Sequence, residues 1–161
     1  MPATTASARS RSPVVENGAR VLHWLNRFPY SLLALPLRLA VATVFWNSAM
    51  TKLANWDAAL ALFTDEYKVP LFPPVVAAHI AVTIELSTPV LLVVGLLTRP
   101  AALVLLGMTT FIEIFVYPLA WPTHIQWAAM LLVLLFRGAG RFSLDYLIAR
   151  RWLPADEKGE R

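Results

Sequence analysis

The sequence predicts an all-α membrane protein: a four-transmembrane-helix bundle with short interfacial helices and both termini cytoplasmic. The composition is the first reason, because 58% of the 161 residues are hydrophobic and only 15% are charged. In a soluble domain about half of the residues are hydrophobic and about a quarter are charged. The second reason is that the apolar residues gather into long runs, with basic residues between and beyond them, as in membrane proteins. A chain of this length has room for one domain.

Four apolar runs have the composition of membrane spans. They cover residues 32–50, 74–97, 101–119 and about 122–136. The last run has only about 15 residues, or about 22 Å of helix, so its outer end could lie recessed among the neighbouring helices. The chain then divides into a tail with a short amphipathic helix over 1–30, a transmembrane domain over 31–137, and an interfacial helix and tail over 138–161.

The distribution of basic residues predicts the orientation, because loops rich in Lys and Arg stay in the cytoplasm. Most Lys and Arg residues precede the first run or follow the fourth, and Arg99 lies between the second and third runs. The other two connections hold two Lys and three acidic residues, namely Lys52, Lys68, Asp57, Asp65 and Glu66. We therefore expect a multi-pass protein of the bacterial inner membrane. Its expected partner is the lipid bilayer and not a nucleic acid.

Three shorter segments place apolar residues at helical spacing, which predicts amphipathic helices at the membrane surface. They lie at 21–28, at 56–63 and at 144–152. Asn55 is suited to cap the second of these helices. Residues 1–16 lack the apolar core of a secretory signal and are expected to form a cytoplasmic tail, although their Arg and Ser content is also that of a transit peptide.

Ionisable residues inside a span are costly unless they are paired or face a cavity, so each is a candidate functional residue. Glu85, Glu113 and His124 each lie twelve residues from the predicted cytoplasmic end of their run, or about 18 Å deep. Arg38 lies about 9 Å deep and shares a helix face with Lys52. We predict that Glu85, His124, Arg38 and Glu113 are the catalytic residues.

Residues near the outer boundary are the candidates for binding a cofactor. Tyr117 and Trp121 lie there, and with Lys52 they are predicted to contact a quinone, although the cofactor itself is not fixed by the sequence. Thr109, Glu113 and Tyr117 are spaced by four and predict one polar stripe on the third span.

Each candidate also has a purely structural interpretation. Arg38 could pair helices or extend to the surface, a neutral Glu113 could bind Thr109, His124 could cap the fourth helix, and Lys52 could be an anchor. In the second span, Pro89 cannot donate to the Glu85 carbonyl, which Ser87, Thr88 or water would then satisfy.

The absence of cysteine excludes thiolate nucleophiles and cysteine-ligated zinc or iron–sulfur sites. No metal site is predicted, because two carboxylates and one histidine without a second histidine are a weak signal. Ligation of haem by two histidines is disfavoured, because His79 lies much nearer the outer boundary than His124. Ligation by His124 with Met50 or Met108 is not excluded.

Several segments carry a family resemblance. They are RLAVATVFWNSAMTKLANW, LFTDEYKVPLFPP, ELSTPVLLVVGLLTRPAAL, FVYPLAWPTHIQWA and GAGRFSLDYL. In this order and spacing, residues 34–150 resemble the DoxX family of small four-helix membrane proteins. The resemblance implies a four-helix bundle with cytoplasmic termini. Its founding members are described as subunits of a quinone-linked thiosulfate oxidoreductase or terminal oxidase, and others are associated with oxidative stress.

The positions that match the family are Arg38, Lys52, Glu85, Arg99, Trp121, Pro122, His124 and the 143–145 turn. At Glu113, similar proteins more often carry Gln. The resemblance and the residues together predict a membrane component of a quinone-linked redox or oxidative-stress system. In this hypothesis Glu85 and His124 exchange protons with the quinone, and Arg38 or Lys52 keeps the carboxylate charged.

Two other functions stay open, as do catalytic activity and homo-oligomerisation. One is a non-catalytic scaffold that recruits a redox partner subunit or soluble enzyme at the cytoplasmic face, through SLDYL at 143–147 and the Arg pair that follows. The other is a small-solute transporter. A redox role predicts that Glu85, Glu113 and His124 converge on one cavity, whereas a scaffold predicts that each is paired locally without a pocket.

Overall fold

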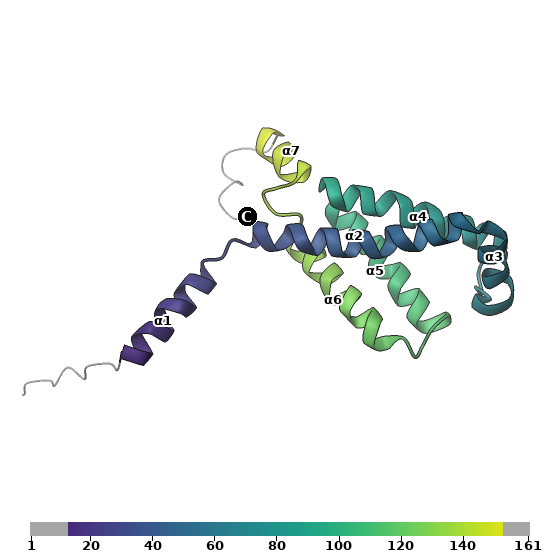
Figure 1. The fold of residues 1–161 in the computed structure, drawn as a ribbon. Helices are drawn as coiled ribbons and strands as arrows, with labels where there is room; N and C mark the ends of the chain where they lie inside the picture. The colour runs from purple at the N-terminus through teal and green to yellow at the C-terminus, as the bar shows by residue number, and fades with distance from the viewer. Residues whose placement is uncertain (1–12, 153–161) are drawn as a thin grey trace, which may run out of the picture.

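The computed structural model describes residues 13–152, and every regular element in this range is helical. The elements are α1 (Pro13–Asn26), α2 (Tyr30–Ala54), α3 (Trp56–Ala61), the π-helix η1 (Leu62–Tyr67), α4 (Pro74–Val94), α5 (Thr98–Phe115), α6 (Trp121–Arg137) and α7 (Leu144–Trp152) (Figure 1). The predicted all-α class is confirmed. Residues 1–12 of the predicted tail at 1–16 lie outside the described range, as do residues 153–161; residues 13–16 belong to α1, so the helix begins earlier than predicted.

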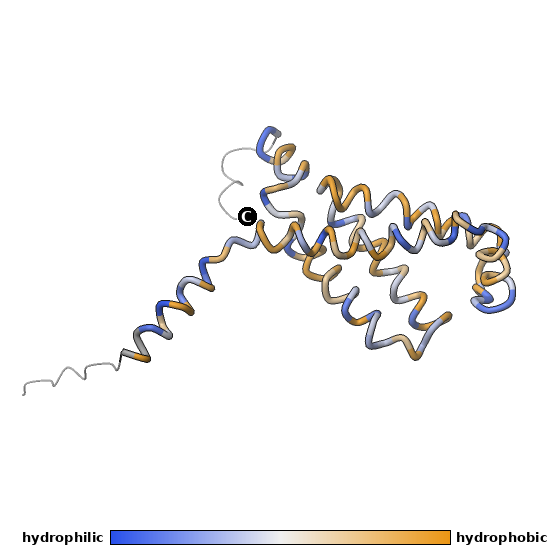
Figure 2. The backbone as a smooth tube through the Cα atoms, in the orientation of Figure 1, coloured by the Kyte–Doolittle hydropathy of each residue, from blue (hydrophilic) through white to orange (hydrophobic). Residues whose placement is uncertain are grey.

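Three helices, α2, α4 and α5, are long and apolar enough to cross a membrane. Helix α6 corresponds to the fourth predicted run and has 17 residues, or about 26 Å of helix, against a hydrocarbon core of about 30 Å. The fourth crossing therefore stays a prediction. Figure 2 shows hydrophilic residues at α3 and η1 and at the tip of α7, outside the long helices.

The four long helices pack as two close pairs, α2 with α4 and α5 with α6, joined by contacts between α4 and α5 and between α2 and α6. Buried alanines such as Ala34, Ala42, Ala49, Ala78 and Ala102 line the interfaces. Small residues let helix backbones approach closely, which matters in lipid because apolar burial does not drive helices together there. Larger apolar residues, among them Phe45 and Leu105, fill the centre.

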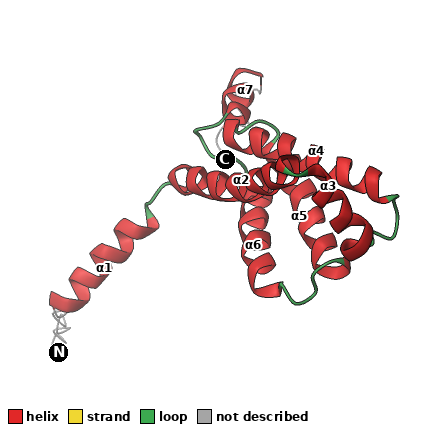
Figure 3. Ribbon diagram, turned by 45° about the vertical axis from the view of Figure 1, so that its right-hand side comes forward, coloured by secondary structure: helices red, strands yellow, loops and turns green. Residues whose placement is uncertain are grey.

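The two ends of the bundle carry different elements. Helices α1 and α7 lie at one end, and α3 lies at the other (Figure 1); Figure 3 shows α1 extending away from the bundle. The three short helices expected from helical spacing are thus present as α1, α3 with η1, and α7. Asn55 caps α3 as predicted, because its Oδ1 accepts a hydrogen bond of 3.0 Å from the Ala58 amide.

Two predicted boundaries are wrong in ways that affect the site. Helix α5 ends at Phe115 and not at residue 119, because Pro118 disfavours helix before it. Tyr117 therefore lies beyond the helix, and the predicted stripe of Thr109, Glu113 and Tyr117 is broken. Helix α4 ends at Val94 because Gly95 adopts the left-handed conformation, with φ of 71°.

Candidate functional site

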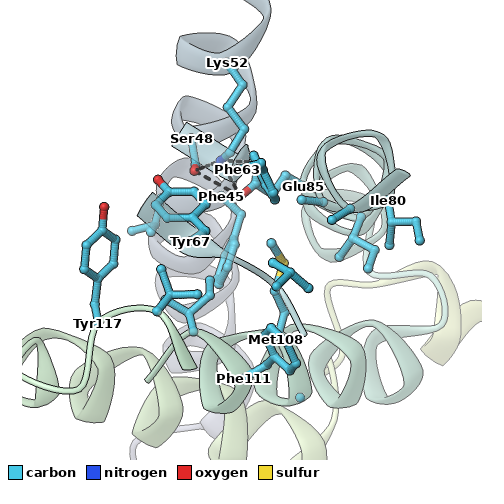
Figure 4. Close-up of a pocket in the computed structure, with 18 of the residues that line it drawn as sticks. Phe45, Ser48, Lys52, Phe63, Tyr67, Ile80, Glu85, Met108, Phe111 and Tyr117 are labelled. Carbon is cyan, nitrogen blue, oxygen red and sulfur yellow. Dashed lines mark hydrogen bonds and ion pairs between the residues drawn. The ribbon is translucent and has the colours of Figure 1, made fainter. Parts of the chain in front are cut away.

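A cavity of about 630 Å³ lies between α2, α4, α5 and α6, in the half of the bundle nearer α3. Aromatic side chains and Met108 form much of its wall, and Figure 4 shows Phe45, Phe63, Tyr67, Met108 and Phe111 around it. Phe63 and Tyr67 come from η1, so this irregular segment forms the wall of the cavity at the α3 end. Such walls suit a flat, apolar ligand.

One polar group on the wall joins α2 to α4. Lys52 Nζ donates to both carboxylate oxygens of Glu85 at 2.8 Å and to Ser48 Oγ at 2.7 Å. The Ser48 hydroxyl in turn donates to Glu85 Oε1 at 3.0 Å. The Glu85 side chain is only 2% exposed and that of Lys52 15%. All three lie beside the cavity (Figure 4), and we call them the Lys52 triad.

A second polar group joins α5 to α6. Glu113 Oε2 and His124 Nδ1 are 2.5 Å apart, and the His124 side chain is 6% exposed. His124 and Trp127 both line the cavity, and their rings lie 5.1 Å apart. The Trp127 ring also packs edge to face on Phe45, which holds the α6 wall against α2. We call this pair the Glu113–His124 pair.

The three predicted mid-membrane residues do not form one cluster. Glu85, Glu113 and His124 lie nine, fifteen and thirteen residues from the ends of their helices that face α7, or about 14, 22 and 20 Å from those ends. We call the α7 end of the bundle the inner end and the α3 end the outer end. The predicted common level is wrong for Glu85, because α4 ends earlier and α5 begins earlier than the apolar runs suggest. Glu85 and His124 still line the same cavity, and each has a local partner.

Arg38 lies outside the cavity. Of the two cations predicted to pair with the Glu85 carboxylate, Arg38 does not contact it and Lys52 does. The Arg38 side chain is buried at the inner end of the bundle. It donates to the carbonyls of Leu92 at 2.6 Å, Val93 at 2.5 Å, Ala139 at 3.1 Å and Phe142 at 2.7 Å. The Leu92 and Val93 carbonyls belong to the last turn of α4, where the usual helical donors are missing; the Leu92 carbonyl also accepts from the Gly95 amide at 3.2 Å.

The segment after α6 completes this inner cluster. Asp145 accepts hydrogen bonds from the amides of Leu97 and Thr98 at 2.7 and 2.9 Å, which caps the start of α5. Gly95 permits the close approach, because a Cβ there would lie 2.5 Å from Ser143 Cβ and 2.8 Å from Arg38 Nη2. Arg38 and the 143–145 turn therefore fix helix ends and do not contact a ligand in the cavity.

Tyr117 and Trp121, the two aromatic candidates, are placed differently. Tyr117 lines the outer rim of the cavity, and its hydroxyl donates to Glu66 Oε1 at 2.6 Å. Burial and the hydrogen bond to the Glu66 carboxylate raise the pKa of Tyr117 above its ordinary value. Trp121 is 56% exposed at the start of α6 and is not among the residues that line the cavity.

Sequence reasoning missed Ser48, although it lies four residues before Lys52 on the same face of α2. It also expected Ser87 or Thr88 to satisfy the Glu85 carbonyl freed by Pro89. Those hydroxyls instead bind the carbonyls of Thr83 and Ile84. Within residues 13–152, no three His, Asp or Glu side chains converge closely enough to hold a metal ion.

The fold and the cavity define a helical, multi-pass membrane protein with a polar, aromatic-lined site between its helices. Residues 33–118 match the family model named DoxX. A Haemophilus influenzae protein described as uncharacterized is 32% identical over 131 residues, which cover 72% of this chain and 83% of that protein. No solved structure matches the chain. The chain belongs to the DoxX family.

Proposed function

We propose that this chain binds a quinone in the cavity and acts as a membrane component of a quinone-linked redox system. The observation that carries the proposal is that one aromatic-lined cavity between the helices is lined both by the Lys52 triad and by His124, which Glu113 holds from outside the cavity lining. A quinone ring is flat and largely apolar, with two oxygens that need hydrogen-bonding groups. Aromatic walls with a few polar groups match that chemistry.

The residues supply proton-handling groups. A quinone takes up two protons when it receives two electrons, and we assign the electrons to a flavin, haem or iron–sulfur centre of a partner subunit. His124 can take or release a proton at its ring, and the Glu85 carboxylate can do so at its oxygens. Lys52 stabilises the charged form of Glu85. Phe63 and Tyr67 present aromatic rings at the α3 end of the cavity.

The orientation belongs to the same proposal: both termini in the cytoplasm of a bacterial inner membrane, with the cavity in the outer half. The basic residues Arg99, Arg137 and Arg150 cluster at the end that carries α1 and α7, as the positive-inside rule requires. Because the chain lacks cysteine, Leu119→Cys and Arg150→Cys provide unique labels. We expect an impermeant maleimide to label Leu119→Cys in intact cells and Arg150→Cys only after lysis; the reverse pattern contradicts the orientation.

The test of quinone binding is to purify the full chain in mild detergent and identify co-purifying small molecules by mass spectrometry. A Cβ added at Gly107, which lines the cavity, meets no atom within 4 Å. Gly107→Leu therefore fills the cavity, whereas Thr110→Leu, on α5 but outside the cavity lining, is the matched control. We expect a stoichiometric quinone in the parent protein and in Thr110→Leu, and at least a tenfold loss (about 1.4 kcal/mol) in Gly107→Leu.

Two results would overturn this function. A protein that carries no quinone, and binds none when a short-chain ubiquinone is added, contradicts it. An absorbance spectrum with a Soret band would point to haem in the cavity, where Met108 and His124 both lie.

The scaffold alternative is supported by the exposed apolar face of α7, which includes Leu147 and Trp152. Ser143 and Asp145 of the same segment bind inside the chain, so we assign the contact with a partner to this face and the Arg pair. An Arg150→Glu, Arg151→Glu variant that sheds a co-purifying enzyme while remaining inserted would favour that function.

A further inference from the structure

We infer that the cavity prefers the reduced, hydroxyl-bearing form of its ligand, a hydroquinone, and that His124 Nε2 accepts the hydrogen bond from that hydroxyl while Glu113 fixes the imidazole. This inference rests on the proposed function and specifies which redox form binds. It follows from an account of the donors and acceptors that the cavity wall has left.

The Lys52 triad has no donor to spare. The ammonium group has three N–H bonds, and the structure directs them to Ser48 Oγ and to the two oxygens of Glu85. The Ser48 hydroxyl donates its single proton to Glu85. A ligand carbonyl that approached this wall would have to displace one of these bonds. The pairing also neutralises the charge of Lys52, so the triad does not attract an anion.

The Glu113–His124 pair leaves one atom available. The 2.5 Å contact between His124 Nδ1 and Glu113 Oε2 requires one proton between the two atoms, and we assign that proton to Nδ1 because an ionised carboxylate can only accept hydrogen bonds. In the neutral imidazole the other nitrogen, Nε2, is then an acceptor. Within residues 13–152 no hydrogen bond occupies Nε2, and His124 lines the cavity. The wall thus presents an acceptor to the ligand at this point.

An acceptor distinguishes the two forms of a quinone. A hydroquinone offers an O–H to Nε2, whereas a quinone offers only carbonyl oxygens, whose lone pairs would oppose that of Nε2. Asn47 and Tyr67 supply a further amide and a further hydroxyl on the wall; each offers both a donor and an acceptor and so does not discriminate. One hydrogen bond gained by one form and denied to the other corresponds to about tenfold in affinity.

Glu113 is a positioning residue in this inference, because it contacts His124 and not the ligand. Glu113→Gln keeps the size of the side chain but removes the constraint, since an amide can present either its oxygen or its N–H₂ to Nδ1. The imidazole is then free to place its proton on Nε2, which would favour the quinone. His79 is the matched control: its Nδ1 contacts the Val75 carbonyl at 2.7 Å and it lies outside the cavity.

The experiment measures the binding of three probes to the full chain in lipid nanodiscs by anaerobic equilibrium dialysis. The probes are reduced ubiquinone-1, oxidised ubiquinone-1 and the dimethyl ether of the reduced form, which keeps the shape but lacks O–H donors. We expect the reduced probe to bind about tenfold more tightly than the other two, and Glu113→Gln to bring the ratio of reduced to oxidised affinity close to one. His79→Gln should leave that ratio unchanged.

The outcomes separate the two proposals. If none of the probes binds, the proposed function fails and takes the inference with it. If the oxidised probe binds as tightly as the reduced one, or if Glu113→Gln leaves the preference intact, quinone binding stands and the inference is overturned.

A ligand-free measurement tests the proton position directly. The sequence has three histidines, and ¹⁵N shifts of histidine-labelled protein, assigned by difference with His124→Phe, report which nitrogen carries the proton. We expect His124 to be protonated at Nδ1 in the parent protein and at both nitrogens in a mixture of tautomers in Glu113→Gln. Protonation of His124 at Nε2 in the parent protein contradicts the inference whether or not the variants bind ligand.

Discussion

Arg38 and Lys52 lie fourteen residues apart on one face of α2, yet they meet opposite environments. Arg38 binds four backbone carbonyls at the inner end of the bundle, whereas Lys52 binds only side chains beside the cavity. At the inner end, carbonyls left over from the end of α4 and from the 139–142 loop require donors. At the outer end, the polar groups satisfy one another and face an open space.

The difference shows that an ionisable residue within a membrane helix is not by itself evidence of chemistry. The forked guanidinium of Arg38 can reach several carbonyls at once, which suits it to joining helix ends. A side-chain cluster on a cavity can instead change partners when a ligand enters. The inner cluster should therefore dominate stability, and the outer groups should dominate binding.

The largest effect is expected from Arg38→Met, which retains much of the apolar stem but removes the guanidinium that donates to the Val93, Ala139 and Phe142 carbonyls. We expect a loss of about 3 kcal/mol or more in the free energy of unfolding, seen as a strongly lowered midpoint in thermal unfolding in detergent. Arg38→Lys should recover only part of the loss, since an ammonium cannot reach all four carbonyls. A midpoint equal to that of the parent protein would remove the structural role assigned here.

Lys52→Met should be the next largest, because it leaves the buried Glu85 carboxylate without its cation. We expect a loss of about 3 kcal/mol. Adding Glu85→Gln should restore about 1–2 kcal/mol, since no unpaired charge then remains. Thermal unfolding of the two single variants and the double variant gives the coupling energy, and strictly additive effects would show that the pair does not interact.

Two glycines sharpen the contrast between the regions. Gly95→Ala places a Cβ against Ser143 and Arg38 at a backbone with φ of 71°, so we expect a loss of about 2 kcal/mol. Gly107→Ala on the cavity wall meets nothing within 4 Å and should gain about 0.5–1 kcal/mol from helix propensity. Equal effects of the two substitutions on the unfolding midpoint would show that the inner end is no more tightly packed than the cavity.

The smallest effect is expected from Tyr117→Phe, which removes the hydrogen bond to Glu66 and should cost at most about 1 kcal/mol. Because the pKa of Tyr117 is raised above 10.0 in the folded protein, the phenol contributes its full stability below that pH and loses it as the pH rises through the folded value. The difference between parent and variant should therefore be constant from pH 6 to 9 and shrink in more alkaline buffer. A difference that grows with pH would contradict the direction of the shift.

The sequence by itself determined the all-helical fold and the positions of the long helices, because apolar runs separated by Pro, Gly and basic residues leave few alternatives in lipid. It also singled out Glu85, His124, Arg38, Glu113 and Lys52, because ionisable groups are conspicuous in apolar runs. Helix ends were less well predicted: hydropathy does not register Gly95 or the effect of Pro118, and a shift of three residues moved Glu85 off the expected level.

Only the tertiary structure decided which of these polar residues meet. The choice of Lys52 over Arg38 as the partner of Glu85, and the pairing of Glu113 with His124, depend on how α2 packs on α4 and α5 on α6, and residue spacing within one helix carries no information about its neighbour. The cavity likewise arises where four helices and η1 leave space between them. Side-chain identity fixes what each residue can bind, but the partner is set by contacts between segments distant in the chain.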